Sequence, residues 1–175
     1  MIVTLIGYRG SGKSSVAPPL AERLGLPWLD VDLLIEQRAG KSIREIFATD
    51  GEPVFRKLER DLIAESLHED KLILALGGGA ILDPQTRAAI RAAGPVVWLK
   101  ASVDVIADRI LGDDATRQRR PDLTGLGGRD EIELLLAQRT PIYQQSATLT
   151  LVTDGRTIGE LVELIVHAIP QGADG

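Results

Sequence analysis

The 175-residue sequence has no cysteine, only 3 % aromatic residues and no long apolar run. Without cysteine, disulfide bonds and thiolate metal sites are impossible. So few aromatic residues give no stacking platform for nucleic acid, and a net charge of -5 argues against a nucleic-acid surface. No stretch comes near the ~18 apolar residues that a membrane span needs. We therefore expect no nucleic-acid partner and no membrane association.

The residues that are present are typical of a folded globular protein. Hydrophobic residues make up 44 % of the chain and charged residues 26 %, which excludes wholesale disorder. Met1 leads directly into an apolar run instead of the charged start of a signal peptide, and this favours a cytoplasmic location. The length is near the usual size of one domain, so we interpret residues 1–175 as a single domain.

The strongest motif is a phosphate-binding loop, or P-loop, near the start of the chain. An apolar run at 2–6 leads into GYRGSGKS at 7–14, which fits the pattern G-x-x-x-x-G-K-[ST] between a strand and a helix. Its glycines let backbone N–H groups turn toward phosphate oxygens, and the next helix adds its positive N-terminus. Lys13 would then reach the β- and γ-phosphates, and Ser14 would hold Mg²⁺. The alternative is a glycine-rich turn with an exposed lysine.

Strand and helix patterns alternate along the chain. The apolar runs predict strands at 2–6, 27–32, 72–76, 95–99 and 148–152. Helical spacing and caps predict helices at 15–24, 33–39, 54–67, 84–93, 103–111, 130–144 and 158–169, and a further one between Ser42 and Gly51. Pro18 and Pro19 predict a kink or a shortened first helix, and Pro141 predicts an interruption near the end of another.

This alternation indicates an α/β fold, with three layers (α/β/α) around a central parallel sheet of about five strands. Ligands of such sheets gather at the carboxyl ends of the strands. The P-loop follows the first strand, Asp30 and Asp32 follow the second, and three glycines follow the third. We therefore expect the functional site at this edge.

Asp30 and Asp32 are the candidate acids beside the P-loop. Alternate residues of a strand point the same way, so both could face the γ-phosphate. One would sit near the water shell of Mg²⁺, and the other would orient or deprotonate a substrate hydroxyl. The alternative is a solvated strand end with Asp32 as a helix N-cap.

Candidate substrate ligands lie farther along the chain. Arg56 comes one helical turn before Glu59, which could hold its guanidinium for a substrate carboxylate, although spacing alone leaves an ordinary surface pair equally open. Three successive glycines, 77–79, favour close approach of the backbone to a ligand over a merely flexible turn. For Arg139, spacing alone favours a surface position over a second carboxylate contact.

The stretch 112–128 is polar, rich in arginine and flanked by glycines, and it predicts a mobile loop. Arg117, Arg119 and Arg120 lie in it. One of them, closing over the phosphates, would neutralise transition-state charge and help to exclude water. A solvated basic loop is the alternative.

Taken together, these residues resemble the shikimate kinases, small P-loop kinases of the nucleoside-monophosphate-kinase fold, over residues 2–169. The matching segments are GYRGSGKSS, the DVD at 30–32, SIREIFATDGEPVFRKLE, LALGGGAIL, the pair Arg120-Pro121 and QRTPIY. The resemblance implies ATP- and Mg²⁺-dependent phosphorylation of the shikimate 3-hydroxyl in the route to aromatic amino acids. It also implies a substrate-binding helical segment at about 33–62 and a lid at about 112–124, and the compact chain favours a monomer.

The resemblance implies a role for each site residue. Asp32, Lys13 and Arg120 would be catalytic. ATP would be bound by Gly10, Ser11, Gly12, Lys13, Ser14, Ser15, Arg109, Arg120 and Arg156. Shikimate would be bound by Asp32, Phe47, Phe55, Arg56, Gly77, Gly78, Gly79 and Arg139. Ser14 would hold Mg²⁺, with Asp30 in the outer shell of the metal.

Two other functions stay open at this point. The first is another small-molecule kinase of the same fold, similar to gluconate kinase, and the second is a module that senses shikimate or nucleotide without turnover. The joint presence of Arg56, the three glycines and Arg139 favours shikimate over gluconate. Intact Lys13 and Asp32 argue against a sensing module.

Three features depart from the usual pattern of the family. Pro18 and Pro19 stand where good helix formers are usual. Asp122 places an acid after the arginine-proline pair of the predicted lid. Arg9 occupies a P-loop position that is more often small or apolar, where it would either contact phosphate or point to solvent.

Overall fold

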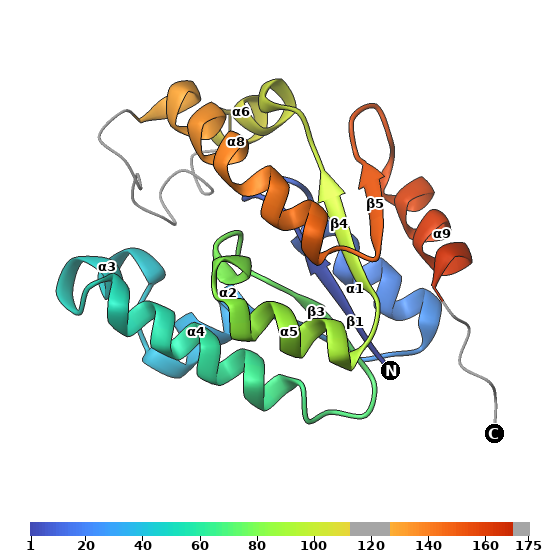
Figure 1. Ribbon diagram of the computed structural model, residues 1–175, viewed down its shortest axis with the longest axis horizontal. Coiled ribbons are helices and arrows are strands. Elements are labelled where there is room, and N and C mark those ends of the chain that lie inside the picture. Colours follow the sequence, from blue (N-terminus) through green and yellow to red (C-terminus); the bar gives the residue numbers. More distant parts are fainter. Residues whose placement is uncertain (113–126, 170–175) are drawn as a thin grey trace.

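The structure is a computed structural model, and it describes residues 1–112 and 127–169 (Figure 1). Most of the predicted lid at 112–124, including Arg117, Arg119 and Arg120, therefore lies outside the described residues. Within the described part of the chain, no helix is long and apolar enough to cross a membrane.

The described residues form a five-stranded parallel sheet in the order β2-β3-β1-β4-β5. The strands are β1 (Ile2–Ile6), β2 (Trp28–Asp30), β3 (Leu72–Ala75), β4 (Val96–Lys100) and β5 (Leu149–Val152). In the register, Leu5 lies opposite Ala75 of β3 and Val97 of β4. The central β1 thus delivers the P-loop to the carboxyl edge of the sheet, between two neighbouring strands.

Helices and one 3-10 turn connect the strands. They are α1 (Lys13–Leu24), α2 (Val31–Ala39), α3 (Ile43–Thr49), α4 (Glu52–Ser66), η1 (Ala80–Leu82), α5 (Pro84–Ala93), α6 (Val103–Leu111), α8 (Gly128–Ser146) and α9 (Ile158–Ala168). The expected helix from Ser42 is confirmed, and Ser42 and Glu45 form its capping box.

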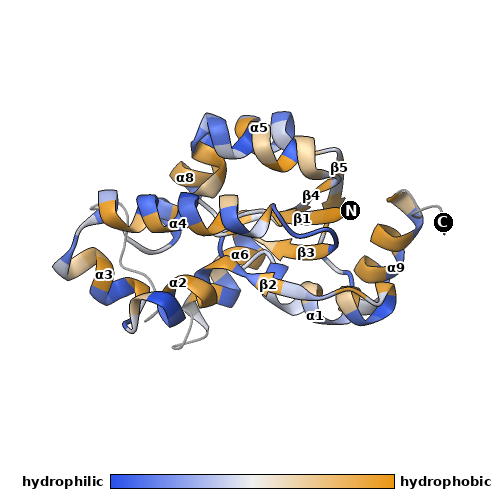
Figure 2. Cartoon of the chain, turned by 90° about the horizontal axis from the view of Figure 1, so that it is seen from below, coloured by the Kyte–Doolittle hydropathy of each residue, from blue (hydrophilic) through white to orange (hydrophobic). Residues whose placement is uncertain are grey.

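The two faces of the sheet pack against different helices, as the alternation of side chains along a strand requires. Ile2 and Ile6 of β1 belong to a core with α2, α3, α4, α5 and α8, whereas Val3 and Leu5 belong to a core with α1 and α9. Figure 1 shows these layers on either side of the sheet, and Figure 2 shows apolar residues along the strands and parts of the helices. The predicted three-layer fold is confirmed.

The prolines shorten neither of their helices, and the interruption expected near Pro141 is wrong. Helix α1 runs from Lys13 to Leu24 without a break although it contains Pro18 and Pro19. Pro18 and Pro19 are half-buried, while Val16 and Leu20 are buried in the core against the sheet. This burial of an apolar face offsets the two missing hydrogen bonds. Helix α8 likewise continues through Pro141 to Ser146.

The second strand is also shorter than predicted. It ends at Asp30, and α2 begins at Val31, so Asp32 lies in the first turn of a helix instead of in the strand. The carboxylate of Asp30 is the N-cap of α2, since it accepts hydrogen bonds from Asp32 N and Leu33 N. This cap begins the helix earlier than the apolar pattern indicates.

Candidate active site

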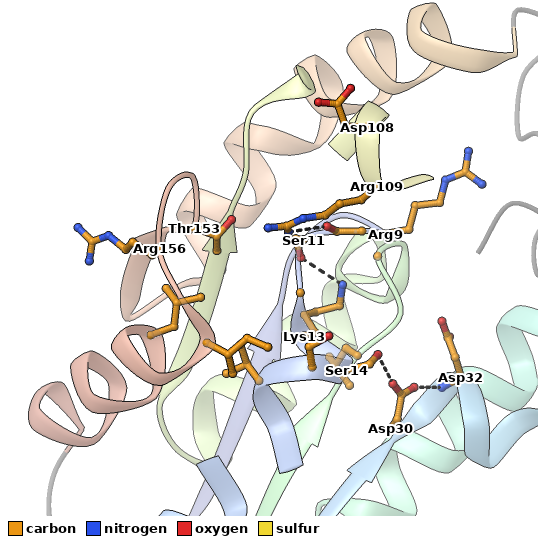
Figure 3. A pocket seen from close by; sticks show the side chains of 18 of the residues that line it. Arg9, Ser11, Lys13, Ser14, Asp30, Asp32, Asp108, Arg109, Thr153 and Arg156 are labelled. Carbon is orange, nitrogen blue, oxygen red and sulfur yellow. Dashed lines mark hydrogen bonds between the residues drawn. The ribbon is translucent and has the colours of Figure 1, made fainter. Parts of the chain in front are cut away.

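A cavity of about 690 Å³ opens at the carboxyl edge of the sheet, where the P-loop, α2 and the loop after β5 meet (Figure 3). Its wall contains Gly10, Ser11, Gly12, Lys13, Ser14 and Ser15 of the P-loop, together with Asp30, Asp32, Gly78, Arg109 and Arg156. The structure thus brings together most of the residues predicted for ATP, and both candidate acids.

The P-loop has the conformation that its glycines permit. Gly10 and Gly12 have φ angles of 77° and 102°, in the left-handed region that side chains disfavour. The loop then enters the 12-residue helix α1, whose first N–H groups have no partner in the helix. Loop amides and a helix N-terminus in this arrangement favour a negatively charged group.

Lys13 is folded into the loop. Its Nζ donates hydrogen bonds of 2.9 Å to the backbone carbonyls of Gly7 and Tyr8, and the side chain is buried. These hydrogen bonds offset part of the free-energy cost of removing the ammonium group from water, and they hold the group in the wall of the cavity. From this position a lysine can bind phosphate oxygens as a point charge.

Ser14 and Asp30 supply oxygen ligands of the kind that Mg²⁺ prefers. Ser14 Oγ donates to Asp30 Oδ2 at 2.5 Å, as Figure 3 shows. Mg²⁺ in kinases is held by one or two protein oxygens, with phosphates and waters completing six ligands, so this pair fits the ion. Within the described residues, no cluster of three or more His, Cys, Asp or Glu offers an all-protein metal site.

Arg109 and Arg156 line the side of the cavity away from Asp32. Arg109 comes from the last turn of α6, and its Nη1 donates to the Gly10 carbonyl at 2.9 Å. In the turn before Arg156, the carboxylate of Asp154 accepts from Ser102 N at 3.1 Å, which ties this turn to the start of α6.

Arg56 is fixed by two acids of its own helix. Its Nη1 lies 2.7 Å from Glu59 Oε2, as the spacing predicted, and its Nε lies 3.2 Å from Glu52 Oε1, which the prediction missed. Glu59 is buried, so the pair is more than a solvated surface contact. The guanidinium also lies 5.1 Å from the Phe55 ring centroid.

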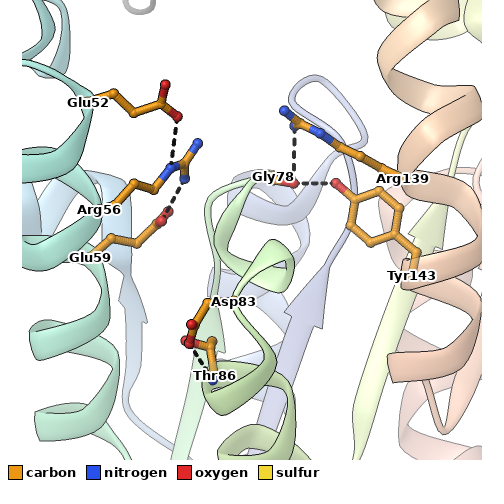
Figure 4. Close-up of polar contacts among 8 residues, drawn as sticks. All are labelled: Glu52, Arg56, Glu59, Gly78, Asp83, Thr86, Arg139 and Tyr143. Carbon is orange, nitrogen blue, oxygen red and sulfur yellow. Dashed lines mark hydrogen bonds and ion pairs between the residues drawn. The ribbon is translucent and has the colours of Figure 1, made fainter.

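Gly78 lies between Arg56 and Arg139 (Figure 4). Arg139 Nη1 donates to the Gly78 carbonyl at 3.3 Å, and Tyr143 Oη donates to the same oxygen at 2.6 Å. A Cβ on Gly79 would lie 2.6 Å from Arg56 Nη2. Two guanidinium groups therefore contact adjacent glycines, and Arg139 is buried, contrary to the surface position that its spacing favoured.

The comparisons with known proteins agree with this geometry. The family model for shikimate kinase matches residues 9–170. The chain belongs to the shikimate kinase family. It is 46 % identical to the shikimate kinase of Thermobifida fusca, covering 99 % of this chain and 97 % of that one. It is 42 % identical to that of Rhodopirellula baltica, covering 95 % and 89 %.

The similar solved structures include a shikimate kinase and a protein that shares only the fold. The shikimate kinase of Acinetobacter baumannii in complex with shikimate is 32 % identical, covers 95 % of this chain and 90 % of that one, and has a TM-score of 0.88. A gluconokinase from Sinorhizobium meliloti is 14 % identical over 92 % of this chain and 86 % of that one, with a TM-score of 0.51. The second likeness shows the fold alone, so the gluconate kinase alternative is not favoured.

Some residues expected from the shikimate kinase resemblance lie outside the cavity wall. Phe47 and Phe55 pack together with ring centroids 4.8 Å apart, and Phe55 is fully buried in the core. Arg56 and Arg139 approach the site at the glycines instead. Arg120 lies outside the described residues, so its role stays a prediction.

Sequence reasoning also missed the surroundings of Arg9, Tyr143 and Tyr8. Arg9 does not point to solvent: its side chain is 15 % exposed, and its Nη2 lies 3.1 Å from Glu131 Oε1 of α8. Tyr143 lies one turn after Arg139, a spacing that could have placed both on one helix face. Burial raises the pKa of the Tyr8 phenol, although nearby Arg9 and Arg139 lower it in part.

Proposed function

We propose that the protein transfers the γ-phosphoryl group of ATP to the 3-hydroxyl of shikimate, giving 3-phosphoshikimate and ADP. The observation that carries this proposal is the meeting of Arg56 and Arg139 at Gly78 and Gly79, beside the P-loop. Paired guanidinium groups suit a carboxylate, which shikimate has. The family membership of the chain supports the same reaction.

In the proposed reaction, the P-loop holds the triphosphate and Lys13 neutralises charge between the β- and γ-phosphates. Mg²⁺, held by Ser14 with Asp30 in its outer shell, would supply further neutralisation of the phosphate oxygens. Arg120 would add a positive charge from the lid, which would also exclude water from the γ-phosphate.

The acceptor side depends on Asp32 and the two arginines. The substrate carboxylate would bind Arg56 and Arg139, and the backbone of Gly77, Gly78 and Gly79 would contact the ring hydroxyls. Asp32 would accept the proton of the 3-hydroxyl. The hydroxyl oxygen would bond to the γ-phosphorus of ATP while the bond between the γ-phosphorus and the bridging oxygen of the β-phosphate breaks. Positioning by these contacts supplies most of the catalysis. Phe47 and Phe55, which lie outside the cavity wall, would support the ring pocket from behind.

The test is ADP release from ATP and Mg²⁺ with shikimate, with gluconate or with no acceptor. We expect release with shikimate only, and Lys13→Ala as the inactive control. Release with gluconate only would keep the kinase chemistry and overturn the substrate. A folded protein that binds ATP without acceptor-dependent release would favour the sensing module.

A cytoplasmic location and a monomeric state are also parts of this proposal.

A further inference from the structure

The loop that carries the nucleotide site also contacts helix α8, which carries Arg139. Tyr8 is almost fully buried, in a cluster that includes Ile132 and Leu135 of α8. The guanidinium carbon of Arg139 lies 5.6 Å from the centroid of the Tyr8 ring, within the range of a cation–π contact. The P-loop is therefore in direct contact with Arg139, the residue proposed to bind the substrate carboxylate.

Arg9, the next residue of the P-loop, binds the beginning of the same helix. Its Nη2 lies 3.1 Å from Glu131 Oε1, and the two side chains are 15 % and 0 % exposed. Glu131 lies in the first turn of α8, where the helix N-terminus favours a negative charge. A buried ion pair holds its partners in place, because separating them would leave an uncompensated buried charge.

Gly78 completes the junction between the P-loop and α8. A Cβ at Gly78 would lie 3.2 Å from Arg9 N and 3.3 Å from Gly7 O, so the glycine loop packs directly on the P-loop backbone. Its carbonyl accepts from Arg139 and Tyr143. Helix α8 is thus held at Glu131 and again at Arg139, about 12 Å farther along its axis. A shift at the first point would displace the second.

We propose that Arg9 and Glu131 are positioning residues of the acceptor site: their ion pair fixes α8 against the P-loop and thereby sets the place of Arg139. This inference rests on the proposed function, in which Arg139 binds the shikimate carboxylate. Because Arg9 lines the cavity, the competing role is a direct phosphate contact. The contact of Nη2 with Glu131 and the burial of Nε favour the positioning role.

Steady-state kinetics test the inference. The variants are Arg9→Met, Glu131→Gln, the double variant that combines them, and Arg9→Lys. We expect each of the first two to raise the KM for shikimate by about tenfold or more, with the KM for ATP changed less than about twofold. The double variant should match one single variant instead of multiplying both effects. Arg9→Lys, which keeps the charge, should restore much of the loss.

Arg23→Met is the matched control, because Arg23 forms a 3.0 Å ion pair with Glu163 in which the side chains are 52 % and 50 % exposed. We expect it to leave both KM values unchanged. A rise in the KM for ATP alone in Arg9→Met, with Glu131→Gln normal, would overturn the inference in favour of a phosphate contact. Unchanged KM values in both would overturn it outright. If Arg9→Met does not fold, the isosteric Glu131→Gln carries the same test. Wild-type protein inactive on shikimate would instead overturn the proposed function.

Discussion

A single hydrogen bond joins Ser14 to Asp30 and connects the helix after the P-loop with the helix that carries the proposed base. Ser14 Oγ lies 2.5 Å from Asp30 Oδ2, while Asp30 Oδ1 accepts from Asp32 N at 3.0 Å. One carboxylate therefore orients the proposed metal ligand and caps the helix of Asp32. Its loss should affect both stability and catalysis.

Asp30→Ala is expected to lower the free energy of unfolding by about 1 kcal/mol through loss of the N-cap of α2. It should also lower kcat/KM by about 10- to 100-fold, because outer-shell groups orient a metal and its ligands. Denaturant unfolding and steady-state kinetics measure the two effects. Asp83→Ala is the control, since Asp83 caps α5 in the same way and does not line the cavity. An equal loss of activity in both variants would show that the effect of Asp30 is on folding only.

Asp32→Asn is expected to lower kcat by about 10²- to 10⁴-fold, the usual contribution of a general base, while ATP still binds. The reason is that an amide cannot accept the proton of the attacking hydroxyl, whereas the P-loop remains intact. Calorimetric titration with a non-hydrolysable ATP analogue measures nucleotide binding separately from turnover. Unchanged turnover would remove Asp32 from the mechanism.

Gly79→Ala is expected to raise the KM for shikimate more than the KM for ATP. The backbone of Gly79, with φ of −101°, suits alanine, but the new Cβ would lie 2.6 Å from Arg56 Nη2 and would push the guanidinium from its place. Gly159→Ala is the control, because apart from its chain neighbours and the backbone of its own helix no atom lies within 4 Å of the new Cβ. That change should leave both KM values unchanged and stabilise α9 by up to about 1 kcal/mol. Equal KM values in wild type and Gly79→Ala would show that Arg56 does not bind the substrate.

The fold and the conformation of the P-loop were predictable because their signals are local. The strand-loop-helix order around the P-loop, the capping box at Ser42 and the apolar strands, apart from the end of the second, each depend on residues a few positions apart and are confirmed. The pair of Arg56 and Glu59 is also local, at one helical turn, although only its burial separates it from an ordinary surface pair.

Contacts between distant segments were beyond reach of the sequence. Arg9 and Glu131 are 122 positions apart, and no periodicity indicates which acid an arginine will meet. The full length of α1 through Pro18 and Pro19 was missed for a related reason. The sequence shows the local free-energy cost of proline in a helix, but the burial of Val16 and Leu20 that offsets it depends on tertiary packing. The early start of α2 depends on Asp30 acting as a cap and as a partner of Ser14 together.

The stability of the protein should depend on pH through Asp83. Burial would raise the pKa of this carboxyl, but hydrogen bonds from Thr86 N and Thr86 Oγ1, at 2.7 and 2.8 Å, outweigh it and hold the pKa below the ordinary 3.8. A pKa lower in the folded state than in the unfolded state stabilises the fold above the unfolded pKa, and this stabilisation is lost as pH falls through the folded pKa.

The comparison is with Asp83→Asn, which keeps a capping side chain but carries no charge. Above about pH 5, wild type should be more stable than the variant by about 0.3 to 1 kcal/mol, and the difference should disappear at more acidic pH. Urea unfolding of both proteins across this range measures it, and a difference that does not change with pH would show that the charge of Asp83 is not its source.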